Sequence, residues 1–155
     1  MSEEYNHKIL EAFIAKPEKT LWYEMSFSKF NINGVDAMKW NWSWWGFAGG
    51  FLFLLYRKQY LAAAVVFFAS MTIGMIPFMG LVIAILVGGY GTFFVYKGYK
   101  KKLLEVENNI EDEILRVKTM AEVGGYHQWV VWLYAIFVTL MFFGIFSALT
   151  IPSFL

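Results

Sequence analysis

Few side chains in this sequence are of the types that catalyse reactions or bind metals. The chain has two histidines, His7 and His127, and no cysteine, which excludes disulfides, iron–sulfur clusters and cysteine-ligated zinc. A polar pocket joining Glu122, His127 and Asn41 is the arrangement that would support an enzyme. A single histidine near one carboxylate is more often a solvated group than a metal ligand. We therefore predict no catalytic residue, no metal site and no cofactor.

The stretch Gly88-Gly89-Tyr90-Gly91 has the composition of a potassium-channel filter. No Thr-Val pair precedes it, and it lies within an apolar run of helical length. Channels and carriers also usually place an ionisable group at membrane depth, and the three main apolar segments have none. The stretch therefore predicts a helix rather than a filter. Transport of an ion or small solute by an oligomer stays open as an alternative function.

The composition indicates a membrane protein rather than a water-soluble domain. The 155 residues are 59% hydrophobic and 21% aromatic but only 16% charged, whereas soluble chains have about 25% charged residues. Apart from Arg57 and Lys58, no charged residue falls between Trp40 and Tyr96. A net charge of +1 without a basic patch argues against nucleic-acid binding.

Three apolar segments are long enough, or nearly so, to cross a bilayer as helices: residues 60–76, 78–96 and 129–151. A crossing takes about 20 residues because the hydrocarbon core is ~30 Å thick. The first two segments must form a hairpin over residues 60–96 that turns at Pro77. The pattern predicts an all-α, polytopic integral membrane protein with three transmembrane helices.

Lysine and arginine near the ends of spans indicate orientation. Basic residues flank the hairpin on both sides, so both flanks are predicted to be cytoplasmic and the turn external. The residues concerned, which we also expect to contact lipid headgroups, are Arg57, Lys58, Lys97, Lys100, Lys101 and Lys102. The N-terminus, which has no signal-peptide pattern, is then cytoplasmic and the C-terminus external.

Residues 40–56 form a Trp-rich segment that allows two interpretations. Its interfacial aromatic residues are Trp40, Trp42, Trp44 and Trp45, and tryptophan favours the headgroup region. As a helix the segment would span about 25 Å, so it could cross a thinned bilayer as a fourth short span. We favour a re-entrant segment that enters and returns, because it keeps the N-terminal tail in the cytoplasm.

The polar regions predict a cytoplasmic layer. Residues 97–125 combine the basic run with an amphipathic helix over 103–123, whose apolar residues recur at helical spacing. The N-terminal tail, residues 1–39, contains a short helix before Pro17 with an apolar face of its own. We expect these two helices to pack against each other at the cytoplasmic surface.

Small residues recur at helix-packing spacing in the apolar segments. They are Ser70 and Gly74, then Gly80, Ala84 and Gly88, and finally Gly144 and Ala148. Such residues let helix backbones approach closely in a bilayer. They serve either packing within one chain or the interface of a homo-oligomer. Self-association is favoured, since three helices offer few inward faces.

The run KWNWSWWGFAGGFLFLLYRKQYLAA resembles the signature of an uncharacterised bacterial membrane protein family, domain of unknown function 2628. The matching residues are Asn41, Trp42, Gly46, Gly50, Leu55, Tyr56, Arg57, Lys58 and Tyr60. The resemblance covers residues 19 to about 125 and fits residues 129–151 less well. It implies an integral protein of the inner membrane and no established activity.

The predicted protein acts by interaction or assembly, as a scaffold or regulatory subunit, and is not an enzyme. Its expected partners are membrane lipids, further copies of itself and a membrane protein. The alternative is the oligomeric channel or transporter named above.

Overall fold

The computed structural model describes residues 3–32 and 34–150, and for residues 148–150 it describes the backbone alone. Within that part the chain forms eight helices and one two-stranded antiparallel ladder. The elements in chain order are α1 (Glu3–Ile14), α2 (Pro17–Ser28), β1 (Asn31–Ile32), β2 (Val35–Asp36), α3 (Trp44–Gly49), α4 (Phe51–Tyr56), α5 (Tyr60–Thr72), α6 (Met79–Asn109), α7 (Glu113–Val123) and α8 (Gln128–Thr150).

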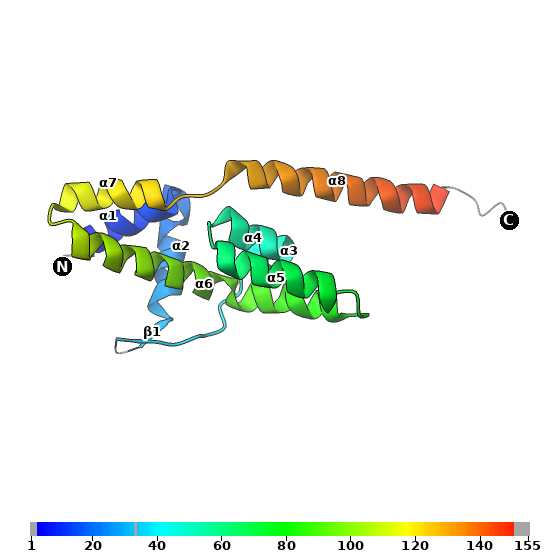
Figure 1. Cartoon of the computed structure of the whole chain (residues 1–155), viewed down its shortest axis with the longest axis horizontal. Coiled ribbons are helices and arrows are strands. Elements are labelled where there is room, and N and C mark those ends of the chain that lie inside the picture. The colour runs from blue at the N-terminus through cyan, green and yellow to red at the C-terminus, as the bar shows by residue number, and fades with distance from the viewer. Residues whose placement is uncertain (1–2, 33, 151–155) are drawn as a thin grey trace.

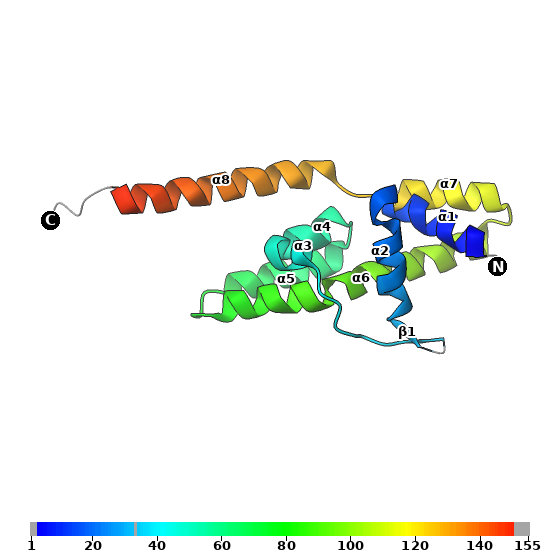
Figure 2. The ribbon, with the colours of Figure 1, turned by 180° about the vertical axis from the view of Figure 1, so that it is seen from behind.

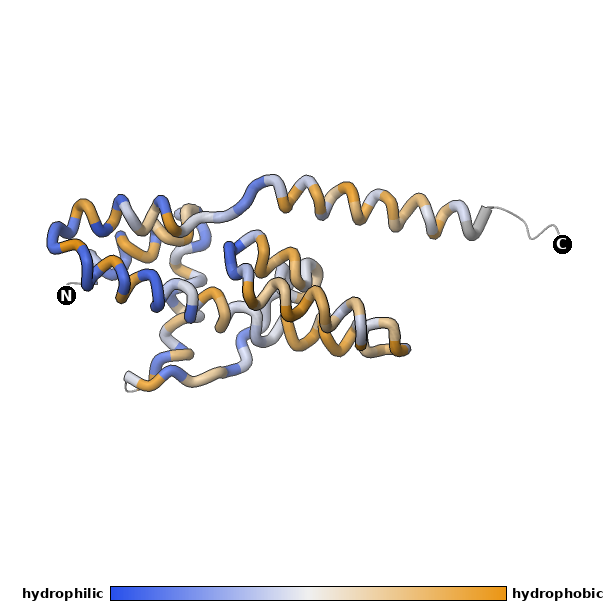
Figure 3. The backbone as a smooth tube through the Cα atoms, in the orientation of Figure 1, coloured by the Kyte–Doolittle hydropathy of each residue, from blue (hydrophilic) through white to orange (hydrophobic). Residues whose placement is uncertain are grey.

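The elements separate into two parts along the molecule. In the first, which we call the head, α1, α2 and α7 gather around the C-terminal half of α6 (Figures 1 and 2). In the second, α3, α4 and α5 lie beside the N-terminal half of α6, while α8 packs on α4 near its start and then extends away. Polar residues are concentrated in the head, and apolar residues dominate α5, the first half of α6 and α8 (Figure 3).

An aromatic core joins α2 to α6 in the head. The ring of Phe27 lies 5.4 Å from that of Tyr96 and 5.5 Å from that of Tyr99. The ring of Phe30 lies 5.4 Å from that of Phe93. Burying one such side chain contributes about 1.5–3 kcal/mol. The head therefore has a hydrophobic core of its own, built on the polar half of the longest helix.

Local signals explain where several helices begin. Pro17 starts α2, at a position where its missing N–H leaves no hydrogen bond unmade. The Ser43 hydroxyl caps α3 by accepting from the amide of Gly46 at 3.1 Å. The Asp112 carboxylate caps α7 by accepting from the amide of Ile114, also at 3.1 Å. Each side chain satisfies an amide that the first turn of a helix leaves without a partner.

Two helices have the length and apolar composition to cross a membrane: α6, and the segment Glu113–Ser147, most of which is α8. The helix expected over residues 60–76 is shorter, because α5 ends at Thr72 and its 13 residues rise about 20 Å. The amide of Gly74 turns back to the carbonyl of Ala69 at 3.2 Å, as at many helix ends. The chain therefore leaves the helix before Pro77. The end of the expected span at residue 151 lies outside the described residues.

The polar regions differ from the expectation in two places. The tail has two helices and the β ladder rather than one short helix, because Pro17 begins a second helix. The helix expected over 103–123 is divided: α6 continues to Asn109, Ile110 has extended backbone, and Asp112 then caps α7. The expected packing does occur, since α1 lies against α7.

Candidate functional site

The polar side chains singled out from the sequence do not form one pocket. The Asn41 amide group donates to the Ser26 hydroxyl at 3.1 Å and accepts from Lys29 Nζ at 3.0 Å. Nε2 of His127 lies 2.6 Å from the hydroxyl of Tyr60. Among the described residues no cluster of three His, Cys, Asp or Glu side chains could hold a metal ion.

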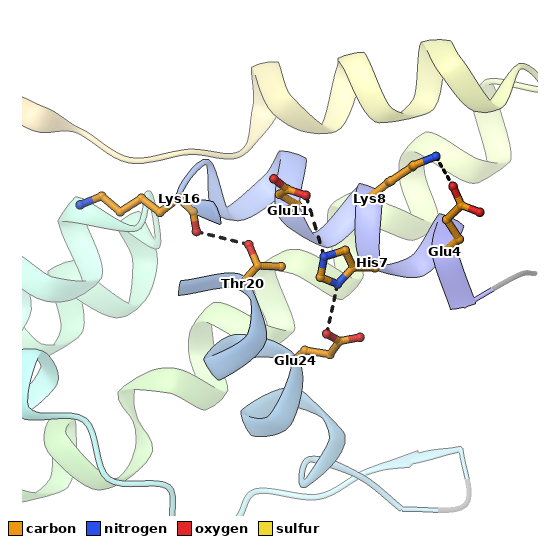
Figure 4. A network of polar contacts seen from close by, with 7 residues as sticks. All are labelled: Glu4, His7, Lys8, Glu11, Lys16, Thr20 and Glu24. Atoms are coloured by element: carbon orange, nitrogen blue, oxygen red, sulfur yellow. Dashed lines mark hydrogen bonds and ion pairs between the residues drawn. The ribbon is translucent and has the colours of Figure 1, made fainter. Parts of the chain in front are cut away.

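His7 belongs to a surface network between α1 and α2 (Figure 4). Its Nδ1 lies 3.2 Å from Glu24 Oε2, and its Nε2 lies 3.9 Å from Glu11 Oε2. On the same helix Lys8 Nζ donates to Glu4 at 2.5 Å. All five side chains are exposed, and exposed pairs contribute at most about 1 kcal/mol each. The network helps to orient α1 on α2 and does not enclose a site.

The Trp-rich segment first runs along α6 toward the N-terminal end of that helix. Just before it, the carboxylate of Asp36 accepts hydrogen bonds from the Tyr96 hydroxyl at 2.7 Å and from Lys100 Nζ at 2.5 Å. Further along, the backbone amide of Asn41 donates to the carbonyl of Gly89 at 2.8 Å. The extended chain therefore runs from the head toward the middle of the apolar half of α6.

The segment turns where it reaches Val87 and Gly88. The amide of Ser43 donates to the carbonyl of Gly88 at 2.7 Å, and α3 begins at the next residue. Gly46, on α3, lies so close to α6 that a Cβ atom there would be 2.8 Å from the carbonyl oxygen of Val87. Glycine is therefore required at this contact between two helix backbones.

The return path leads back toward the head. Phe53, on α4, lies beside Gly91, and the side chain of Gln59 covers Gly98. Asp36, before the segment, and Gln59, after it, therefore both lie beside residues 96–100 of α6. With a rise of 1.5 Å per residue, the turning point is about 16 Å from Gly98 along that helix. The chain therefore reaches α6 as extended backbone and returns toward the head as the helices α3 and α4.

Three of the four tryptophans of the segment form a chain of ring contacts, in which Trp40 and Trp42 lie against Gly89 and Gly88 of α6. The rings of Trp40 and Trp42 stack at 6.0 Å, and those of Trp42 and Trp44 meet edge to face at 5.3 Å. Trp40 also contacts Tyr90 of α6 at 5.3 Å. Trp44 and Trp45 are largely exposed. Large rings of this amphipathic type are enriched where hydrocarbon meets headgroups.

Arg57 is a buried cation, 5% exposed, rather than a solvated flank residue. Its Nη1 donates to the carbonyl of Ile14 at 3.0 Å, at the C-terminal end of α1. Its guanidinium lies over the rings of Tyr23 at 4.7 Å and Tyr56 at 5.3 Å. Helix C-termini present unpaired carbonyls and favour cations. Within the described part of the chain no carboxylate forms an ion pair with Arg57, and its Nε has no hydrogen-bond partner.

The other basic residues near the spans also have contacts within the chain. Lys58 donates to the carbonyl of Gly124 and Lys102 to that of Val123, Lys100 pairs with Asp36, and Lys97 lies 5.9 Å over the ring of Phe93. The side chain of Lys101 is exposed. The sequence reasoning missed these roles. The partners of Lys58, Lys100 and Lys102 are distant in the sequence, whereas Phe93 lies one turn before Lys97 in α6.

The ends of α1 and α4 meet the start of α8 at one junction. The amide of Gly125 donates to the carbonyl of Phe13 at 2.7 Å, and that of His127 to the carbonyl of Tyr56 at 3.0 Å. Beside this junction a cavity of about 610 Å³ lies between α2, the segment 42–57 and the first turns of α8. Its wall contains Arg57, together with other charged side chains and several aromatic rings.

The predicted small-residue face divides between two environments. The space beside Gly88 is occupied by side chains of the same chain, since a Cβ atom there would be 2.9 Å from atoms of Trp42 and Phe47. Gly80 faces the carbonyl of Gly74 across the hairpin, and the hydroxyl of Ser70 bonds back to its own helix. Gly144 faces open space, since a Cβ atom there would meet no other described group within 4 Å. Ala84 is half-buried on α6, and the side chain of Ala148 lies outside the described residues.

Several ionisable groups have shifted pKa values, and two of them, Tyr23 and Asp36, bear on this region. Burial raises the pKa of Tyr23, and the nearby Arg57 charge opposes the shift. Hydrogen bonds from Lys100 and Tyr96 hold the pKa of Asp36 below its ordinary value of 3.8. Asp36 is therefore ionised at neutral pH, and its hydrogen bonds attach the chain before the Trp-rich segment to α6.

Comparison with family models, curated proteins and solved structures gives no match for this chain. The resemblance to domain of unknown function 2628 accordingly stays a prediction based on the residues quoted for it.

Proposed function

We propose that this chain is a small integral protein of a bacterial inner membrane that acts by assembly, as a scaffold or regulatory subunit. The observation that carries the proposal is the exposure of apolar side chains along α8. Val130 is buried at its start, but nine apolar side chains between Val131 and Phe143 are each at least 43% exposed. A soluble monomer rarely exposes so large an apolar surface. Lipid or another membrane protein must therefore cover this helix.

The proposed topology has the head in the cytoplasm, with α5, the first half of α6 and α8 in the bilayer. The connection between α5 and α6 supports this placement, because Met75 and Phe78 are each 85% exposed and apolar. At about 20 Å, α5 is shorter than the hydrocarbon core. Short spans are accommodated by local thinning of the bilayer, so the hairpin tip lies at the far interface.

The proposed re-entrant placement of the Trp-rich segment is supported by its hydrogen bonds. Non-helical backbone is tolerated at membrane depth only where protein covers it. The extended chain before α3 meets this condition, since the amides of Asn41 and Ser43 donate to carbonyls of α6. A segment that returns also keeps both flanks on the cytoplasmic side.

Impermeant cysteine labelling tests the topology, because the natural chain contains no cysteine. In sealed cells we expect Ser153→Cys to react from outside and Lys118→Cys to react only after the membrane is opened. Trp44→Cys should be inaccessible from outside if the segment is re-entrant. External labelling of Lys118→Cys would overturn the topology.

Assembly is tested by the mass of the protein in nanodiscs. We propose that the open face of α8 around Gly144 contacts a second copy of the chain. Gly144→Ile should therefore lower the fraction of the protein that is oligomeric. Phe142→Ile is the matched control, since residue 142 lies on the opposite side of the helix. A uniform monomer without a membrane partner would contradict the proposal. An oligomer that conducts ions in liposomes would favour the channel alternative.

A further inference from the structure

The cavity beside the α1–α4–α8 junction has a charged end and an apolar end. The basic residues in its wall are Lys16, Lys19 and Arg57, and Glu18 is the acidic one. The apolar part of the wall, which we call the apolar end, includes Trp44, Val131 and Tyr134. With a volume of about 610 Å³, the cavity falls within the range of about 300–1,000 Å³ typical of small-molecule sites.

Arg57 donates to the carbonyl of Ile14, but it has no counter-ion among the described residues. It is only 5% exposed, yet no described carboxylate pairs with it and its Nε–H makes no hydrogen bond. Buried charges in proteins are normally paired, because removing a charge from water is costly. The planar guanidinium fits carboxylate and phosphate groups through two parallel hydrogen bonds. A cavity-lining arginine in this state indicates an anionic ligand.

The two lysines add positive charge at the same end. Lys16 Nζ lies 4.9 Å over the ring of Tyr126, and its side chain points away from the α1–α2 network (Figure 4). Lys19 is exposed at the rim. Glu18 offsets one of these charges, so the wall has a net charge of +2 from three cations and one anion. The positive charge favours a headgroup with a net negative charge over one with no net charge.

The apolar end excludes a small soluble anion as the complete ligand. Trp44 is exposed toward the surroundings, and Val131 and Tyr134 belong to α8, the helix that the proposed topology places in the bilayer. A molecule that fills both ends has an anionic head and a hydrocarbon tail. Such molecules are the phospholipids that surround the protein.

We propose that this cavity binds one anionic phospholipid, with its phosphate on Arg57, Lys16 and Lys19 and one acyl chain along Trp44 and α8. The lipid enters from the bilayer beside the first turns of α8. It supplies the counter-ion that the chain does not provide for Arg57, and it links the head to the membrane part. The site requires the membrane placement proposed above but not any oligomeric state.

Native mass spectrometry of the full chain, released from nanodiscs of mixed phosphatidylcholine and phosphatidylglycerol, tests the proposal. We expect one phosphatidylglycerol per chain to survive release in preference to phosphatidylcholine. The double variant Lys16→Gln/Lys19→Gln should weaken retention about tenfold, since charge-assisted hydrogen bonds are lost. Val131→Trp should also lower retention by filling the apolar end while leaving every charge in place. Lys101→Gln is the matched control, because it removes an exposed charge outside the cavity.

Arg57→Gln is a secondary variant, since Arg57 also holds the end of α1 and its loss could unfold the head. If the double lysine variant and Val131→Trp both retain phosphatidylglycerol as the natural chain does, the lipid is not held in this cavity and the proposal is wrong. Inorganic phosphate supplies a further arm: if it displaces phosphatidylglycerol and Val131→Trp has no effect, the site binds a soluble anion instead. Correct cysteine labelling with equal lipid retention would refute this inference alone and leave the proposed topology in place.

Discussion

Replacing Gly46 by alanine tests whether α3 is seated on α6 as described. The added Cβ atom would lie 2.8 Å from the carbonyl oxygen of Val87 and 3.3 Å from Cα of Gly88. Both obstacles are backbone atoms within a helix, so no rotamer change relieves the clash. The two helices must separate until the contact reaches an ordinary 3.4 Å or more. Gly46→Ala should therefore loosen the contact between α3 and α6 at which the chain turns.

The expected cost combines three effects. Overpacking of a tight contact costs about 1–3 kcal/mol. Separation also lengthens the bond from the Ser43 amide to Gly88, now 2.7 Å, and such bonds contribute about 0.5–1.5 kcal/mol each. Alanine recovers about 1 kcal/mol through its higher helix propensity. We expect Gly46→Ala to reduce the free energy of unfolding by about 2 kcal/mol.

Two glycines of α6 provide graded controls. At Gly80 a Cβ atom would meet its nearest neighbour at an ordinary 3.7 Å, so Gly80→Ala should change the free energy of unfolding little. At Gly89 it would overlap the ring of Trp40, which is 51% exposed and can move aside. The predicted order of destabilisation is therefore Gly46 first, Gly89 second and Gly80 last.

The assay is unfolding in mixed detergent micelles, titrated with sodium dodecyl sulfate and followed by tryptophan fluorescence and circular dichroism. Trp42 and Trp44 lie at the affected contact, so fluorescence should report the change directly. If Gly46→Ala unfolds together with Gly80→Ala and the natural chain, the close approach of α3 and α6 does not exist, and the reasoning fails.

Three further changes can be measured in the same titration. Asp36→Asn should destabilise the protein at neutral pH, and the difference in stability should shrink as the pH falls below 3.8, because a carboxylate with a lowered pKa stabilises the fold above its ordinary value and loses that effect as it protonates. A pH-independent difference would exclude this role. Arg57→Lys should lower the free energy of unfolding by about 1.5–3 kcal/mol. Lysine keeps the charge, but it lacks the planar guanidinium that lies over Tyr23 and donates to the carbonyl of Ile14. Ser43→Ala should lower the free energy of unfolding by about 1 kcal/mol through loss of the α3 cap. A stability equal to that of the natural chain would show that this hydrogen bond does not stabilise α3.

Features determined by nearby residues were predictable from the sequence. The apolar run ahead of Lys97 indicated a membrane-length helix, and α6 has the required length. The apolar face of the tail correctly predicted a helix that packs on the later amphipathic helix. The end of α5 was misplaced, because Pro77 was weighed more heavily than Gly74, where the backbone bonds already turn back.

Features determined by distant partners were not predictable. An arginine next to an apolar run is normally a solvated flank residue. Arg57 is instead buried against the carbonyl of Ile14, which is 43 residues away in the chain. Lys58 similarly bonds to Gly124, 66 residues away. No local pattern encodes these separations, so the junction and its cavity emerge only when the head folds against the end of α4.

The paired glycines of α6 and the tryptophan-rich segment form one structural unit. Extended backbone within a bilayer needs acceptors for its amides, and lipid supplies none. The carbonyls of a helix already accept one bond each, but a carbonyl oxygen has a second lone pair. Gly88 and Gly89 have no side chain of their own to block access to this lone pair. The amides of Ser43 and Asn41 therefore reach their carbonyl oxygens. Glycines with this role belong to a packed contact rather than to an ion filter. Their substitution should therefore affect stability before it affects any conductance.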